Sequence, residues 1–367
     1  PSKLIYHNVF MYLKIKDISN FILSFIKILI TNTFLVIFFV VIFELIFGYW
    51  FDKENFGPYM REHRMKSQKI TWSDNNETIN YTYKRNYYGF RGDDIPPSEI
   101  QAIILGGSTI DEKFKPERYT ITGFINQNLK DNGKSIKIVN AGVWGQTTKG
   151  MVQSFNKWLL KIEDFKPKYI LIYTGMNDKI YVNNQLDDHL LEDEHDGHLI
   201  NPNKREAFFD NIKTRSFIYD QLSIFRYKVL SKRKNFVKFD GKIDENYIKN
   251  FNFITYSQAE KQFDKKQYKK KINKYLNRID KINDLSKKLG AVPIFITNIT
   301  ADGFEKRIFL LNTGLVKHCK EKNYLCIDLA RKINGNVNLW YDGFHTTKEG
   351  SKLFADFITA ELLAYMN

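Results

Sequence analysis

The stretch "IQAIILGGSTID", residues 100–111, is a short apolar run that ends in two glycines and a serine. A short apolar run is typical of a parallel β-strand that is buried on both faces. The paired glycines indicate a turn after this strand. Ser108 is therefore expected where the strand passes into a helix, at the carboxyl end at which open parallel sheets form their functional sites.

Four further apolar runs follow, and helical patterns alternate with them. These runs are "IKIVN" (136–140), "KYILIYTG" (168–175), "VPIFIT" (292–297) and "NYLCIDL" (323–329). The predicted helices cover residues 120–132, 148–163, 259–289, 304–320 and 348–365. This alternation predicts an α/β fold of the flavodoxin-like type, a doubly wound parallel sheet. With 43% apolar residues among 367, the chain can bury a sizeable core.

A long gap, residues 179–256, separates the third predicted strand from the long helix. Such a gap is too long for a plain loop, so we expect an insertion with helices of its own, including "SFIYDQLSIFRYKVLS" (216–231). The first part of the gap is acidic and contains His189, His195 and His198. A metal site there is an alternative to a solvated loop.

Residues 28–51 read "ILITNTFLVIFFVVIFELIFGYWF" and contain one charge, Glu44. A membrane-spanning helix needs roughly 20 mostly apolar residues, so this run predicts a single-pass anchor. Four lysines but only one acid precede the run. The positive-inside tendency therefore places residues 1–27 in the cytoplasm and the rest of the chain outside it, in the periplasm or at the cell surface.

Two alternatives to the anchor are a signal peptide and a buried core helix. No small-residue cleavage site follows the apolar run, which argues against a signal peptide. Asn32 and Glu44 are unfavourable in lipid, and Glu44 is expected to snorkel to the nearby interface. After the anchor we expect a linker or flap at 52–99 and an α/β domain at 100–367, interrupted by the insertion.

The charge and the cysteines restrict the class of protein. The net charge is +15, and residues 231–290 hold 17 Lys and Arg against 7 Asp and Glu. This basic segment indicates either a solvated helix face or an anionic partner, and no zinc-finger or RNA-binding motif points to nucleic acid. Cys319 and Cys326 are expected as two buried free thiols, with pairing as the alternative in an exported domain.

Four strand ends carry residues with complementary chemistry. They are Ser108, Gly145 in "NAGVWGQTT", Asn177 in "YTGMNDK", and the pair Asp342 and His345 in "WYDGFHTTKEG". A serine hydroxyl needs a base to take its proton, and a histidine base needs an acceptor to fix its tautomer. The pattern predicts Ser108 as nucleophile, His345 as base and Asp342 as its acceptor.

The remaining residues at these strand ends have supporting roles. The backbone amides of Ser108 and Gly145 and the side-chain amide of Asn177 are expected to form an oxyanion hole. This chemistry needs no metal and no cofactor. Trp144 lines either the acyl pocket or the core, and Arg91 in "GFRG" contacts either an anionic substrate or a structural acid. Asp178 and Asn140 are expected to brace their loops.

In this order the motifs resemble those of the SGNH (GDSL-type) hydrolase family. The resemblance matches Ser108, Gly145, Asn177 and the pair Asp342 and His345 to four of the family's sequence blocks, and covers residues 100–366. One departure is Gly107, where the founding motif has Asp. The upstream "GFRG" is similar to a segment of membrane-anchored members that are linked to surface polysaccharides.

The resemblance implies a membrane-anchored esterase that removes O-acyl groups, acetyl above all, from extracytoplasmic glycans. Two alternatives remain open. One is an O-acyltransferase that receives its acyl group from a membrane partner, such as a multi-pass acyltransferase. The other is an inactive scaffold that binds glycans within a polysaccharide-assembly complex.

Overall fold

The computed structural model describes residues 2–48, 50–51, 67–74, 77–179, 182, 212, 215–219, 221–222, 225, 237–241, 251–263, 269–333 and 335–366. The chain divides into two compact units. The first comprises residues 1–55 and 212–226, and the second comprises residues 56–211 and 227–367.

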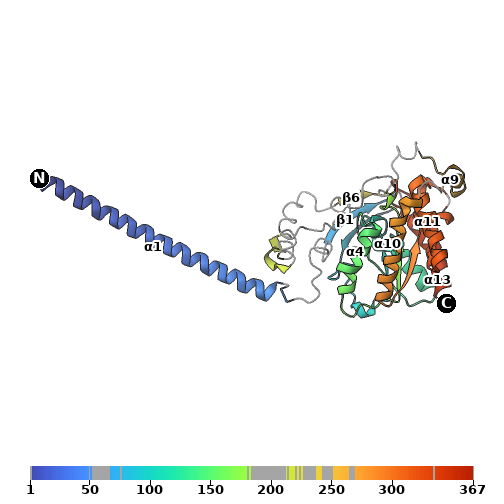
Figure 1. Ribbon diagram of the computed structural model, residues 1–367, viewed down its shortest axis with the longest axis horizontal. Coiled ribbons are helices and arrows are strands. Elements are labelled where there is room, and N and C mark those ends of the chain that lie inside the picture. The colour runs from blue at the N-terminus through green and yellow to red at the C-terminus, as the bar shows by residue number, and fades with distance from the viewer. Residues whose placement is uncertain are drawn as a thin grey trace. The chain divides into compact units, whose positions relative to one another are not determined.

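The first unit contains one long helix, α1 (Ser2–Phe47), which Figure 1 shows in blue. Its part Ile22–Phe47, 26 residues, is long and apolar enough to cross a membrane, and its most apolar window is 0% buried in the protein. The apolar helix therefore begins earlier than the predicted start at residue 28 and also ends earlier than residue 51. Gly48 follows the end of the helix, and a Cβ atom there would lie 2.4 Å from the Glu44 carbonyl oxygen.

The second unit is built on a five-stranded parallel sheet in the order β4-β3-β5-β7-β8. Its strands are β3 (Ala102–Leu105), β4 (Ile138–Asn140), β5 (Tyr169–Tyr173), β7 (Val292–Ile296) and β8 (Leu325–Ile327). The five predicted runs supply these five strands. The second strand in the chain lies outside the first, which is the order of the flavodoxin-like, doubly wound fold predicted from the sequence.

Helices connect these strands. They are α2 (Ser108–Asp111), α3 (Ile121–Asp131), α4 (Thr148–Lys157), α9 (Tyr256–Gln262), α10 (Lys269–Lys288), α11 (Lys306–Lys322), α12 (Leu329–Lys332) and α13 (Lys348–Tyr365). Single 3₁₀ turns cover η2 (Pro97–Glu99), η3 (Glu117–Tyr119), η4 (Leu159–Lys161) and η6 (Val337–Leu339). The prediction of one helix over 259–289 is wrong. Helix α9 ends because Phe263 adopts an extended backbone, and its ring packs on Phe309.

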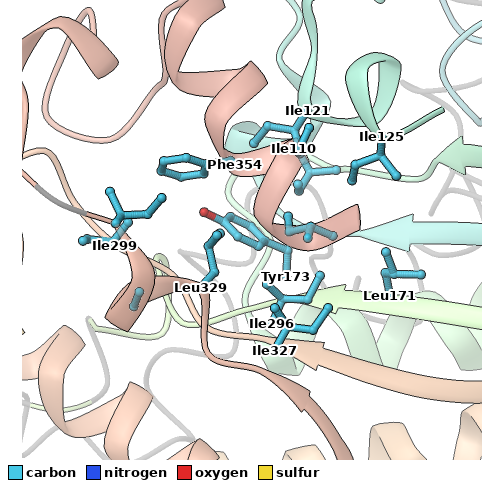
Figure 2. Close-up of a cluster of buried hydrophobic side chains, with 14 of the residues drawn as sticks. Ile110, Ile121, Ile125, Leu171, Tyr173, Ile296, Ile299, Ile327, Leu329 and Phe354 are labelled. Carbon is cyan, nitrogen blue, oxygen red and sulfur yellow. The ribbon is translucent and has the colours of Figure 1, made fainter. Parts of the chain in front are cut away.

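Two hydrophobic cores cover the two faces of the sheet. Helices α4 and α10 pack against each other over one face, and α3 packs against α13 over the other. Successive residues of β3 alternate between the cores: Ile103 joins the first, and Ile104 joins the second. Figure 2 shows part of the second core, where Tyr173 of β5 lies among apolar side chains that include Phe354 of α13.

A second, smaller sheet has the order β2-β1-β6. Strands β1 (Ser67–Ser73) and β2 (Thr78–Lys84) form an antiparallel hairpin, and β6 (Val237–Asp240) pairs parallel to β1. The expected flap at 52–99 therefore contains regular strands, because Ile70 and Trp72 of β1 are fully buried while alternate neighbours face outward. Strand β6 belongs to the insertion at 179–256. Its acidic part, with His189, His195 and His198, lies outside the described residues.

The two cysteines form a disulfide, so the prediction of free thiols is wrong. Helix α11 ends at Lys322, and Asn323 adopts a left-handed conformation with φ 56° that turns the chain back. This turn brings the Cα atoms of Cys319 and Cys326 to 6.2 Å, within the usual range for a disulfide.

Candidate active site

Ser108 is the first residue of α2, and two glycines separate it from the end of β3. The turn before it needs two glycines, since a Cβ atom at Gly106 would lie 2.4 Å from the side chain of Ile110. A Cβ atom at Gly107 would lie 2.7 Å from the Asn177 amide nitrogen. Glycine at 107, the departure from the family motif, therefore lets Asn177 approach the serine turn closely.

His345 lies in the turn between η6 and α13 and contacts both Ser108 and Asp342. The Ser108 Oγ atom is 2.8 Å from His345 Nε2, and the Asp342 Oδ2 atom is 2.7 Å from His345 Nδ1. We call these three side chains the reactive row. The row is partly open to solvent, with 20% of the His345 side chain and 41% of the Asp342 side chain exposed.

Asp342 is held by the backbone of its own turn. The backbone N–H groups of Phe344 and His345 donate hydrogen bonds of 2.8 and 2.7 Å to its Oδ1 atom. Burial by itself raises the pKa of this carboxyl, but the His345 hydrogen bond and charge and the two backbone donors outweigh it, so the pKa of Asp342 lies below its ordinary value. The carboxylate is thus ionised at neutral pH and accepts from the imidazole.

The predicted oxyanion donors lie in the neighbouring turns. The Asn177 side-chain amide donates to the Gln146 carbonyl at 2.9 Å, which fixes the amide beside Gly107. Its nitrogen carries a second proton, which is not needed for that bond. Gly145 adopts a left-handed backbone with φ 67°, a conformation that glycine takes without strain.

Two polar residues brace these turns, as expected from the sequence. The Asn140 amide donates to the Ile110 carbonyl at 2.6 Å, and its oxygen accepts from the Gly142 N–H at 2.9 Å. Asp178 is buried and accepts from the backbone N–H and the hydroxyl of Thr148. The hydrogen bonds of both side chains therefore stabilise the loops that follow β4 and β5.

Arg91 is a structural residue and does not face a substrate. Its guanidinium pairs with Glu117 at 2.6 Å and donates to the backbone carbonyls of Asp111 and Lys115. The side chain is only 2% exposed. The substrate contact considered from the sequence is therefore wrong, because every part of the guanidinium is occupied inside the protein.

A continuous arc of aromatic rings borders the reactive row. The ring of Tyr341 stacks on that of His345 with centroids 5.7 Å apart, and Phe344 contacts the same imidazole edge-on. From Tyr341 the arc continues through Phe239 and Phe114 to Trp144, with centroid separations of 4.9, 5.0 and 5.9 Å. Trp144 and Phe344, at its two ends, are 42% and 41% exposed. Trp144 is thus not a core residue.

The sequence did not predict a second contact between the segment after β3 and the segment that follows His345. It is made by the buried ion pair of Glu112 and Lys115. The Lys115 ammonium donates to the Thr346 carbonyl at 2.8 Å and to the Thr346 hydroxyl at 3.0 Å, and it also contacts the Ser351 hydroxyl. Glu112 accepts from the same two hydroxyls at 3.0 and 2.9 Å. Burial lowers the pKa of Lys115, against the pull of Glu112. The sequence signal that could have indicated this ion pair is a Glu and a Lys three residues apart, shortly after Ser108.

Within the described ranges no group of three His, Cys, Asp or Glu side chains is placed to hold a metal ion. The three histidines of the acidic loop are not among those ranges, so the alternative of a metal there stays a hypothesis.

No protein-family model matches the chain, and no curated protein matches its sequence. Among solved structures, it is similar to a putative lipolytic protein of the G-D-S-L family from Desulfitobacterium hafniense, at 13% identity and a TM-score of 0.39, over 71% of this chain and 99% of that one. It is also similar to a lipase/acylhydrolase from Enterococcus faecalis, at 17% identity and a TM-score of 0.40, over 72% of this chain and 96% of that one. A third similar structure is an acetyl xylan esterase from Geobacillus stearothermophilus, at 12% identity and a TM-score of 0.40, over 72% of this chain and 94% of that one.

Proposed function

We propose that the second unit is a serine ester hydrolase in which Ser108, His345 and Asp342 act as a catalytic triad. The observation that carries this proposal is the reactive row itself, with its two hydrogen bonds of 2.8 and 2.7 Å. A nucleophile within hydrogen-bonding reach of a base, with that base oriented by a third group, is the arrangement that activates a serine.

In the first half of the reaction, Ser108 Oγ attacks the ester carbonyl carbon while His345 Nε2 takes the hydroxyl proton. The tetrahedral intermediate collapses, the bond to the alcohol breaks, and His345 gives the proton to the leaving oxygen. In the second half a water molecule loses its proton to His345 and attacks the acyl-serine. The carboxylic acid leaves, and Ser108 recovers its proton.

Negative charge develops on the carbonyl oxygen in both halves. The backbone amides of Ser108 and Gly145 and the Asn177 amide are the donors for this oxyanion in our proposal. A donor of this kind is typically worth about 3–4 kcal/mol of transition-state stabilisation. The support for Asn177 is its position against Gly107, with one amide proton left for the substrate.

We assign the substrate to O-acyl groups, acetyl above all, on glycans. The aromatic arc supports this class, because sugar rings present faces of C–H groups that pack on exposed aromatic rings. Trp144 and Phe344 expose such faces at the two ends of the arc. Lys179 lies 5.1 Å from the Phe344 ring and pairs with Glu305 at 3.8 Å, so polar groups border that end.

We further propose that α1 anchors the protein in a membrane, with its N-terminus in the cytoplasm and the second unit outside. The support is the 26-residue apolar stretch Ile22–Phe47, whose most apolar window is 0% buried in the protein. The upstream lysines support the direction of insertion.

The test uses the full chain in detergent micelles with p-nitrophenyl acetate as substrate. Ser108→Ala is expected to lower kcat/KM by at least about 10³-fold, since it removes the proposed nucleophile that forms the acyl-enzyme. Ser135→Ala, a change at an exposed serine, is the matched control and should keep full activity. Full activity in Ser108→Ala would rule out the proposed nucleophile.

A second assay separates hydrolysis from acyl transfer. An acetylated oligosaccharide is incubated with the chain, and free acetate and newly acetylated glycan are both measured. Hydrolysis predicts free acetate as the main product. Acetylated acceptor glycan with little free acetate would favour transfer, and no turnover of any ester would favour the inactive scaffold.

A further inference from the structure

Glu44 is a charged residue in the last turn of the apolar part of α1, and its carboxylate is fully engaged. It accepts from the Ser216 hydroxyl at 2.6 Å and from the backbone N–H groups of Phe217 and Ile218 at 3.0 and 2.9 Å. The Trp50 indole N–H adds a fourth bond at 3.1 Å. Glu44 therefore does not reach out to water alone, as expected from the sequence, but holds a segment that follows it by more than 170 positions.

Apolar contacts surround this polar contact. The Phe217 ring lies 5.6 Å from Phe43 and 5.7 Å from Phe47, centroid to centroid. Arg215 donates to the Trp50 carbonyl at 3.0 Å. The contact is thus made by several side chains on both partners, and it fixes residues 215–218 to the end of α1.

The attached segment also exposes large apolar side chains. Ile212, Leu222 and Phe225 are 36%, 60% and 64% exposed, and residues 217–219 and 221–222 are helical. At the same end of α1, Ile46 and Phe47 are 66% and 50% exposed. The apolar surface of α1 therefore continues onto the described residues of this segment.

We propose that the described residues of this segment (212, 215–219, 221–222 and 225) lie in the lipid surface beside the end of α1, and that Glu44 holds them there. This inference rests on the proposed membrane anchor. A helical segment with exposed apolar side chains partitions into the boundary between headgroups and acyl chains. A carboxylate that is bonded to four donors avoids the penalty of an unpaired charge at that depth. Lipid is then the occupant that covers the exposed apolar side chains of Leu222 and Phe225.

The experiment places an environment-sensitive fluorescent label at one position at a time in the full chain, reconstituted in phosphatidylcholine–phosphatidylglycerol nanodiscs. Labels at Leu222→Cys and Phe225→Cys report the inference, and a label at Phe38→Cys, in the middle of the apolar stretch, reports the anchor. The native cysteines are joined in a disulfide and do not take the label. Blue-shifted emission that lipid-attached nitroxides quench several-fold is expected at all three positions.

The outcomes separate the inference from the anchor. Quenching at Phe38 with aqueous, unquenched emission at Leu222 and Phe225 would overturn the inference while the anchor stands. Aqueous emission at Phe38 would overturn both. The Glu44→Gln variant supplies the last comparison. It removes the charge without hindering insertion of α1, so the quenching at Leu222 should fall at least two-fold while that at Phe38 stays. Unchanged quenching at Leu222 in this variant would disprove the fastening role of Glu44.

Discussion

Two links join the segment after β3 to the turn that carries His345, and they differ in burial and in the number of bonds. The reactive row, Ser108–His345–Asp342, is partly exposed, and Ser108 makes one hydrogen bond with His345. The ion pair of Glu112 and Lys115 has side chains only 2% and 3% exposed, and both partners bond the Thr346 and Ser351 hydroxyls.

The difference shows how one turn serves two demands. A proton carrier must exchange partners during a reaction, so it cannot be saturated with hydrogen bonds. The position of that carrier must nevertheless be fixed to within a fraction of an ångström. We infer that the buried pair fixes the turn, which leaves the reactive row free to change its bonds. Variants in each link should therefore affect different quantities.

The largest effect is expected for Asp342→Asn. The Asn oxygen can still accept from the Phe344 and His345 backbone N–H groups, so the turn is kept. Its NH₂ group would face His345 Nδ1 and favour the tautomer with the proton on Nε2, which cannot take the Ser108 proton. We expect kcat on p-nitrophenyl acetate to fall about 10³- to 10⁴-fold with little change in KM. A fall of less than ten-fold would contradict the assigned role.

The same variant tests the pH dependence of stability. Because the pKa of Asp342 is lowered in the folded protein, its carboxylate stabilises the fold above the ordinary pKa of aspartate, roughly 4, and this contribution is lost as the pH falls through the lowered pKa. The wild type should therefore melt above Asp342→Asn at pH 7, and the gap should close at acidic pH. A gap that is independent of pH would show that the carboxylate charge contributes nothing.

The second-largest effect is expected for Lys115→Met, which should lower the free energy of unfolding. This change leaves the Glu112 carboxylate buried without its counter-charge, which typically costs about 3–5 kcal/mol. We expect that loss in denaturant unfolding of the second unit, followed with the detergent-solubilised full chain. Lys348→Met is the matched control, since its ion pair with Glu77 is 27% and 29% exposed and its loss should cost much less.

The double variant Glu112→Gln with Lys115→Met completes this test. It removes both charges, so most of the lost stability should return, and the two changes should be strongly non-additive. Additive losses would mean that the two residues act separately and that the buried pair does not fix the turn.

The sequence was sufficient to predict the site residues that follow the end of a single strand. The positions of Ser108 and Asn177 follow from runs of apolar residues and from the rule that parallel strands end at one edge. His345 was expected at a strand end, but it lies in the turn between η6 and α13. The Glu112–Lys115 link was not predictable, because it joins segments more than 230 positions apart and shows no periodicity.

The pairing of β6 with β1 was not predictable for the same reason. Strand β6 is four residues long and pairs with β1 across more than 160 positions, so no local pattern indicates it. The disulfide depended on the left-handed conformation of Asn323, one of two residues between α11 and β8. In each case the decisive feature is a contact or a backbone conformation that no local sequence pattern shows.

The smallest effect is expected for Trp144→Ala, at the exposed end of the aromatic arc. The residue contacts Phe114 but neither Ser108 nor His345 in the described contacts, so the chemical step should be unchanged. An aromatic contact of this kind is worth roughly 0.5–1.5 kcal/mol, so KM for an acetylated oligosaccharide should rise about three- to ten-fold. On p-nitrophenyl acetate, which has no sugar ring, kcat and KM should stay within about two-fold of the wild type. Trp144→Phe keeps a ring at this place and should restore most of the KM. Equal losses of activity on both substrates would instead show that Trp144 supports the reactive row. The aromatic arc would then help to position the reacting groups and would not only bind the sugar.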